Sequence, residues 1–143
     1  MHLAVKFIYK NEPATRLKAV LYSAQVSAGF PSPAEDYIDK KLDLNEHLIK
    51  HPAATFFVKV EGNSMINAGI HSGDMLIVDR ALEPADKKIV IAVLNGEMTV
   101  KRIRKIKDKL YLMPENDTYQ PTEITEDSAF QIWGVVTNVI HKV

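Results

Sequence analysis

One short stretch offers a serine that could act as a nucleophile. The stretch reads EGNSM over 61–65, and it follows an apolar run with the composition of a buried strand. A serine directly after a strand, in a turn that glycine permits, can be held at the sheet edge with an exposed hydroxyl and backbone N–H groups nearby for an oxyanion. Loop serines are usually only loop residues, so Ser64 becomes a candidate only together with a base.

The candidate base lies in a predicted β-hairpin. Asn95-Gly96 separates two runs of strand-forming residues and favours a two-residue type I′ turn. If Leu94 faces Glu97, the register pairs Val90 with Lys101. Strand alternation then places Lys101 on one face with small or apolar side chains, namely Val90, Ala92, Thr99 and Ile103. The register therefore predicts an inward-pointing amine.

An inward amine could be tuned for proton transfer. A lysine with the ordinary pKa of about 10.4 is protonated at neutral pH and cannot accept a proton from serine. Lowering the pKa of Lys101 to around 7 requires roughly three units, or about 4 kcal/mol, which lies within the range that burial of an ammonium produces. The alternate face, with Arg102 and Arg104 followed by Lys105, Lys107 and Lys109, is expected to form a solvated edge.

Other residues that could carry chemistry give weaker signals. His47 and His51 have the spacing that puts two imidazoles on one helix face, but neither a neighbouring glutamate nor a third ligand accompanies them. The chain has no cysteine, which excludes disulfides, thiolate metal sites and a cysteine nucleophile. No phosphate-binding GxxxxGK[ST] motif occurs. The sequence therefore predicts neither a metal nor a cofactor.

The elements that must position Ser64 and Lys101 are mainly strands. An acidic N-cap at Asp43 and a proline at position 52 predict one short helix over 43–51. After it come six runs of β-forming residues, which cover 54–62, 75–80, 88–94, 97–103, 109–113 and 131–140. A chain of 143 residues with 46% hydrophobic and 25% charged residues fits a single globular domain.

The first 28 residues differ from the rest of the chain. They carry four basic residues and one acidic residue, a net charge of +3, whereas the whole chain is neutral. They lack the apolar length of a signal peptide or a spanning helix, and they lack the two helices of a helix-turn-helix. The stretch SAGFPSP that follows joins the small pair Ala28-Gly29 to two prolines, which favour an extended backbone accessible to a nucleophile.

Several motifs together resemble a known family. The segments SAGFPSPAEDY, HPAATFFVKVEGNSM, SGDMLIVDR, NGEMTVKR and IWGVVT occur in the order found in the LexA-type self-cleaving serine peptidases, and among them in the SOS mutagenesis proteins. The resemblance covers the chain from about Gly29 almost to its end. It implies Ser64 as nucleophile, Lys101 as general base and acid, and Ala28-Gly29 as the bond cleaved. Asn63 departs from the family, where aspartate is common.

The resemblance also implies a fold and partners. The fold is a LexA/signal-peptidase-like β domain of twisted antiparallel sheets with a flexible N-terminal arm and a short helix. Residues 1–28 would be the arm that self-cleavage removes, 29–45 an extended linker and 46–143 the compact core. The partners would be a second copy in a homodimer, the RecA filament on single-stranded DNA and an error-prone Y-family polymerase, in the bacterial cytoplasm. Sequence-specific DNA binding and membrane association are not expected.

Three other functions remain open from the residues alone. The first is a β-rich adaptor with an inert Ser64 and an arm that serves as a docking peptide. The second is a leader or signal peptidase that uses the same dyad on other proteins, which the missing anchor disfavours. The third is a damage-responsive repressor, which the missing DNA-reading helices disfavour. Mass analysis of aged protein would separate the adaptor, which stays intact, from a self-cleaving peptidase.

Overall fold

The computed structural model describes residues 3–11, 18–22 and 38–143 and divides the chain into two units. The first unit consists of residues 1–11 and 53–143, and the second of residues 12–52. The bond Ala28-Gly29 lies outside the described residues, as does the linker up to residue 37. The predicted division of the chain at residue 28 therefore stays a prediction.

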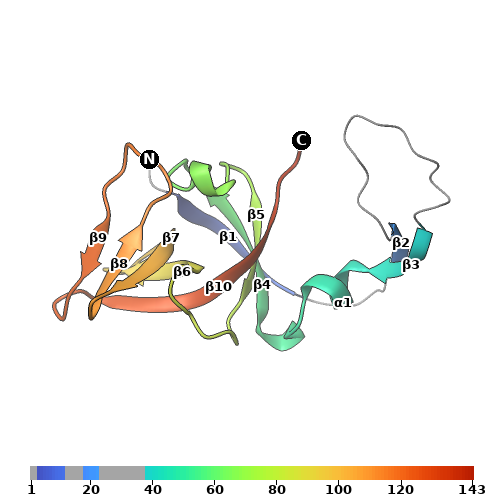
Figure 1. Cartoon of the computed structure of the whole chain (residues 1–143), viewed down its shortest axis with the longest axis horizontal. Coiled ribbons are helices and arrows are strands. Elements are labelled where there is room, and N and C mark those ends of the chain that lie inside the picture. The colour runs from blue at the N-terminus through green and yellow to red at the C-terminus, as the bar shows by residue number, and fades with distance from the viewer. Residues whose placement is uncertain (1–2, 12–17, 23–37) are drawn as a thin grey trace. The chain divides into compact units, whose positions relative to one another are not determined.

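The first unit is an antiparallel β structure (Figure 1). Its strands are β1 (Ala4–Lys10), β4 (Thr55–Glu61), β5 (Met75–Asp79), β6 (Ile89–Leu94), β7 (Glu97–Ile106), β8 (Lys109–Met113), β9 (Thr122–Ile124) and β10 (Phe130–Ile140). Their order in the sheet is β1-β4-β5-β10-β6-β7-β8-β9. A further pairing of Ala4 with Thr99 joins β1 to β7, so the sheet closes on itself in the manner of a barrel. The mainly β fold predicted from the sequence is confirmed.

Two hydrophobic clusters hold this sheet together. Because neighbouring side chains on a strand point to opposite faces, β6 and β7 contribute to both clusters. Ile91 and Val100 belong to the larger one, which also contains Leu3, Val58, Val60, Met65, Ile70, Leu76 and Val78. The smaller cluster, on the other face of β6 and β7, consists of Val90, Ala92, Ile103, Leu112 and Val135. Lys101 belongs to this second face by alternation.

The hairpin between β6 and β7 has the predicted register. Leu94 faces Glu97 and Val90 faces Lys101, with every intervening pair as expected. Asn95 and Gly96 both have positive φ, 51° and 84°, as a type I′ turn requires. All six predicted strand runs are strands.

The structure corrects one expectation about β7 and adds strands that the sequence did not reveal. The basic face of β7 does not lie on a solvated edge, because β7 lies between β6 and β8 and pairs with both. Strands β1 and β9 were not expected. Leu3, just before β1, is completely buried, although the first residues had given no sign of a place in the core.

The second unit contains a strand pair and the predicted helix. Strands β2 (Lys18–Tyr22) and β3 (Ile38–Asp43) pair antiparallel, and helix α1 (Leu44–Leu48) follows directly. The Asp43 side chain accepts a hydrogen bond from the Asn45 N–H at 2.9 Å, which confirms the predicted N-cap. The helix ends before the predicted boundary because Ile49 has an extended backbone. No helix in the described residues is long and apolar enough to span a membrane.

Candidate active site

The turn after β4 positions the candidate nucleophile. Gly62 has a φ of 115°, which a residue with a side chain rarely adopts, so glycine allows the chain to turn out of the strand. Ser64 follows in this turn, ahead of the 3-10 helix η3 (Ile66–Ala68). The sequence predicted an exposed hydroxyl at this position. That prediction is wrong, because Ser64 is completely buried. The backbone of Leu3 covers it, and the Leu3 N–H donates to Ser64 Oγ at 2.8 Å.

Strand β7 brings the candidate base to this serine. Lys101 Nζ lies 3.0 Å from Ser64 Oγ and donates a hydrogen bond to it. The same amine donates to Thr99 Oγ1 at 3.0 Å and to the Val100 carbonyl at 3.1 Å. Lys101 is 5% exposed, which confirms the inward orientation predicted from the hairpin register. The structure thus brings together two residues that lie 37 positions apart in the sequence.

Burial changes the acidity of this lysine. Desolvation lowers the pKa of Lys101 from 10.5 to about 8, because the charged ammonium loses water that the protein does not fully replace. No carboxylate among the described residues forms an ion pair with this amine to counteract the shift. An appreciable fraction of Lys101 is therefore neutral near physiological pH and can accept the Ser64 proton.

Backbone N–H groups are available where a reacting carbonyl oxygen would need them. Among the described residues, no acceptor is hydrogen-bonded to the backbone N–H of Ser64 or of Met65. Donors of this kind, next to a nucleophile in a buried site, are suited to stabilise an oxyanion. The serine, the amine and these amides form an arrangement capable of acyl transfer.

Comparison with known proteins identifies the family. Residues 20–137 match the model of the family described as peptidase S24-like. The protein SamA of Salmonella typhimurium is 50% identical over 124 residues, which cover 87% of this chain and 86% of SamA. The protein MucA of Escherichia coli is 41% identical over 133 residues, which cover 92% of this chain and 90% of MucA. The chain belongs to the peptidase S24 family.

The S24 family joins this chain to two kinds of relative. SamA and MucA are UmuD-like SOS mutagenesis proteins. The LexA repressor of Glaesserella parasuis is 34% identical over 139 residues, which cover 96% of this chain and 66% of the repressor. The family consists of serine proteases and includes self-cleaving members. The buried serine and lysine of this S24 chain lie in two of the five segments on which the resemblance was based.

The segment after β8, residues 115–119, holds the turn that carries Ser64 in this S24 protein. The sequence did not reveal this role of the segment. The Glu115 N–H donates to the Ser64 carbonyl and the Asn67 N–H donates to the Glu115 carbonyl, both at 2.8 Å. Asn116 Nδ2 donates to the Asn63 carbonyl at 2.9 Å, and the Tyr119 hydroxyl donates to Asn63 Oδ1 at 2.8 Å. Asn63 therefore packs against the 115–119 segment, and its side chain contacts Tyr119. No sequence signal connects these two loops.

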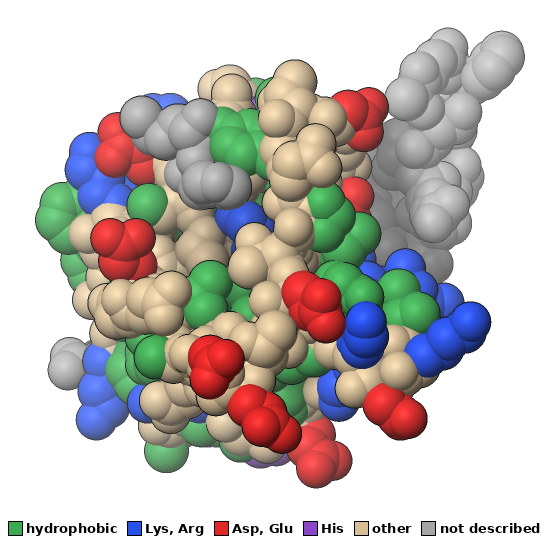
Figure 2. All heavy atoms as spheres, turned by 90° about the vertical axis from the view of Figure 1, so that its left-hand side faces the viewer, with side chains coloured by type: hydrophobic (Ala, Val, Ile, Leu, Met, Phe, Trp, Pro, Cys, Tyr) green, Lys and Arg blue, Asp and Glu red, His purple; other side chains and the backbone are tan. Residues whose placement is uncertain are grey.

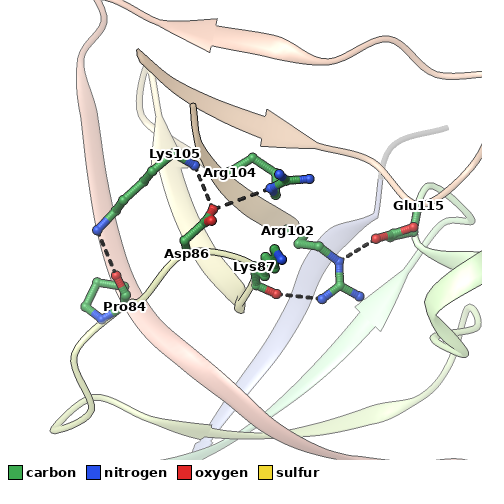
Figure 3. Close-up of polar contacts among 7 residues, drawn as sticks. All are labelled: Pro84, Asp86, Lys87, Arg102, Arg104, Lys105 and Glu115. Atoms are coloured by element: carbon green, nitrogen blue, oxygen red, sulfur yellow. Dashed lines mark hydrogen bonds and ion pairs between the residues drawn. The ribbon is translucent and has the colours of Figure 1, made fainter. Parts of the chain in front are cut away.

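Ion pairs made by Arg102 and Arg104 of β7 reach or lie near the same segment (Figure 3). Arg102 pairs with the carboxylate of Glu115, and its guanidinium also donates to the Lys87 carbonyl at 2.6 Å. Arg104 pairs with Asp86 at 3.4 Å, farther along the strand. The strand that carries the base is thus linked through Arg102 to the segment that holds the nucleophile turn. Thr99, which accepts from Lys101 and was expected only as a small neighbour on the same face, is a further contact of the base.

The histidines that the structure describes do not form a metal site with acidic partners. Within the described part of the chain, no group of three or more His, Cys, Asp or Glu side chains is arranged to hold a metal ion. His47 lies in α1 and His51 follows the helix. His141 Nδ1 lies 2.6 Å from Asp74 Oδ1, and Asp74 also accepts the His71 N–H at 2.8 Å. These contacts attach the chain end after β10 to the turn before β5.

Proposed function

We propose that this chain is a self-cleaving SOS mutagenesis protein that cuts its own Ala28-Gly29 bond with a Ser64/Lys101 dyad. The observation that carries the proposal is the 3.0 Å contact between Lys101 Nζ and Ser64 Oγ, made by an amine with a pKa of about 8. Membership of a protease family that includes self-cleaving proteins supports the reaction class. The bond itself is assigned by resemblance.

The proposed reaction is acyl transfer to serine followed by hydrolysis. Neutral Lys101 takes the Ser64 proton while Ser64 Oγ attacks the carbonyl carbon of Ala28, and the backbone amides at Ser64 and Met65 stabilise the oxyanion. The C–N bond breaks as protonated Lys101 gives its proton to the nitrogen of Gly29, which leaves as a new N-terminus. Water, deprotonated by Lys101, then cleaves the Ala28 ester and restores Ser64.

Attachment of the substrate to the enzyme explains how a weak site could work. A tethered bond has a high effective concentration, so even a poorly binding sequence is cut when it reaches the dyad. A partner that favours the docked state can accelerate cleavage without supplying a catalytic group. We assign that role to the RecA filament on single-stranded DNA. The trimmed protein would act as a homodimer with an error-prone Y-family polymerase.

The surface charge is compatible with protein partners. In the view of Figure 2, which faces the β8–β9 end of the first unit, acidic and basic side chains both occur among hydrophobic ones. Cleavage after Ala28 would remove a segment of charge +3 and leave a negatively charged product, since the whole chain is neutral. A change of this size alters electrostatic steering toward a charged partner.

Intact-mass analysis tests the proposal directly. Purified protein, incubated with and without RecA filaments on single-stranded DNA, is expected to yield a chain that starts at Gly29. Ser64→Ala and Lys101→Ala should each remain uncut while keeping the fold, as judged by circular dichroism. A product starting at Gly29 from either variant would refute the dyad, and an uncut natural chain under all conditions would favour the adaptor function.

A further inference from the structure

The groove beside the dyad already contains a peptide, which is the start of the chain's own strand β1. The Leu3 N–H donates to Ser64 Oγ at 2.8 Å. The Leu3 carbonyl accepts the Thr99 hydroxyl at 2.9 Å and the Val100 N–H at 3.3 Å. Ala4 pairs with Glu61 of β4 and with Thr99 of β7. An extended segment is therefore bound between the strand that leads to the nucleophile and the strand that carries the base.

This segment is firmly held. Leu3 is completely buried in the cluster that contains Val60, Met65 and Ile70. Burying a leucine side chain favours this position because it removes apolar surface from water. From Ala4 to Lys10 the strand also pairs with β4, where Lys10 faces Phe56. Side-chain burial and backbone pairing together favour the occupied groove over an open one.

The bound segment is not presented for cleavage. A serine hydroxyl oxygen has two lone pairs, and here it accepts from the Leu3 N–H and from Lys101 Nζ. While Lys101 donates in this way, neither lone pair is free to attack a carbonyl carbon, and when Lys101 is neutral the Leu3 N–H still occupies one of them. The Leu3 carbonyl itself is engaged by Thr99 and Val100. The segment thus occupies the site as an inhibitory peptide would.

A cavity next to the bound segment has the character of a side-chain pocket. It measures about 210 Å³. Five of its nine lining residues are apolar, namely Leu94, Met98, Leu112 and, from the bound segment, Leu3 and Ala4, and the other four are polar or charged, among them Lys101 and Glu97. Most of these side chains are apolar, so the cavity suits a hydrophobic residue of an extended peptide. The occupant that this groove fits is a β-paired peptide with an apolar side chain.

We propose that residues 3–5 occupy the peptide-docking groove of the active site, and that a substrate peptide reaches Ser64 only after this segment has withdrawn. For cleavage at Ala28-Gly29 the inference rests on the proposed function, whereas occupancy of the groove by Leu3 does not. The observed cleavage rate is then the intrinsic rate multiplied by the fraction of molecules with an open groove. A stimulating partner would act by raising that fraction.

Chain length alone does not limit access to the dyad. At about 3.3 Å per residue, β1 carries the chain roughly 23 Å away from Ser64 between Leu3 and Lys10. The 17 residues from 11 to 27 can span at most about 56 Å, so the bond at residue 28 could return to the dyad of the same chain. The occupied groove is therefore the obstacle, for the chain's own arm and for the arm of a second copy alike.

The absence of cysteine provides a test that does not depend on cleavage. Ser64→Cys introduces the only thiol in the chain, and its alkylation by iodoacetamide, followed by intact mass, reports access to the site. Adding Leu3→Asp should accelerate alkylation at least tenfold because a buried carboxylate expels the segment. Phe7→Asp on the same strand, where Phe7 is 50% exposed, should leave the rate unchanged. Equal rates in the Leu3 variant and its parent would overturn the proposal.

A reversible crosslink tests the same inference in the reacting protein. Ala4 and Glu61 are exposed cross-strand partners, so Ala4→Cys with Glu61→Cys can form a disulfide that locks the segment in place without altering the core. Cleavage at residue 28 should be at least tenfold slower in the oxidised protein and recover on reduction. Equal rates in both states would refute the inference. If even the reduced protein and the natural chain stay uncut with RecA, the proposed function fails, while the alkylation result still decides the occupancy of the groove.

Discussion

Lys101 combines burial with a contact to a hydroxyl, and both properties follow from its place in one hairpin. The turn at Asn95-Gly96 fixes the register, and the register puts the amine on the face of Val90 and Ala92. Desolvation there lowers the pKa of Lys101 to about 8. Arg102 points to the opposite face, so its charge is a smaller influence than burial. A group that must lose its proton before it can act gives the reaction a pH dependence.

The cleavage rate should rise with pH and then level off. Because the neutral form of Lys101 is the base, the rate should increase about tenfold between pH 7 and pH 9 and change little above that, given a pKa of about 8. Gel or mass analysis of self-cleavage in the absence of RecA, across this pH range, measures the profile. A rate that is flat from pH 6 to pH 10 would contradict a titrating lysine base.

Burial of the same amine should also cost stability. A lysine whose pKa is lower in the folded state binds its proton better when unfolded, so the penalty is present in full below about pH 8 and disappears as pH rises to 10.5. Lys101→Met should therefore raise the free energy of unfolding by on the order of 2 kcal/mol at pH 7 and by less at pH 10. Urea unfolding of both proteins at pH 7 and pH 10 measures this difference in the free energy of unfolding. A difference that does not shrink with pH would mean that packing, and not charge, causes the effect.

At the level of elements, the dyad depends on one turn and one strand, both of which contact the segment after β8. The nucleophile turn after β4 is hydrogen-bonded to Glu115, and Glu115 is paired with Arg102 on the strand of the base. Both side chains of this ion pair are about 30% exposed, so its direct contribution to stability is small, about 1 kcal/mol or less. We expect its main effect to be on the relative placement of Ser64 and Lys101.

Arg102→Gln should slow cleavage more than it destabilises the fold. Loss of the pair allows Glu115, and with it the Ser64 turn, to shift, and we expect a three- to tenfold lower rate with an unchanged pH midpoint. Arg104→Gln is the matched control, because Arg104 lies on the same face but pairs with Asp86. Cleavage kinetics and thermal unfolding of both variants measure the effect. An equal loss of rate in both variants would show that Arg102 affects cleavage only through the general stability of the fold.

The strands around the dyad were predictable, and the strand that covers it was not. Asn95-Gly96 has a strong intrinsic preference for a type I′ turn. The β6–β7 hairpin and the burial of Lys101 could therefore be derived from local sequence. Strand β1 mixes Lys6 and Lys10 with apolar residues and has its partners on β4, about fifty positions away. Long-range pairing of this kind leaves no local signal, and the same is true of the contact between Glu115 and the Ser64 turn.

For the whole molecule, β1 is both part of the sheet and part of the segment that cleavage would remove. With β1 in place, the pairing of Ala4 with Thr99 closes the sheet. A chain that starts at Gly29 lacks Leu3 and the whole of β1, so the edge of β4 (Thr55–Glu61) would present unpaired N–H and C=O groups. Self-cleavage would therefore change the architecture of the first unit as well as its charge.

The trimmed protein should be less stable than the intact chain and specifically looser along β4. Losing a completely buried leucine costs about 2–5 kcal/mol, and the amides of β4 that pair with β1 lose their acceptors. Urea unfolding and hydrogen exchange of the cleavage product, compared with intact Ser64→Ala protein, measure both effects. Strand β8, which has no contact with β1 in the sheet order, serves as the internal reference. Unchanged protection along β4 would mean that another strand, from a second copy or a partner, replaces β1 at this edge. Dilution should then dissociate that strand and expose the amides of β4.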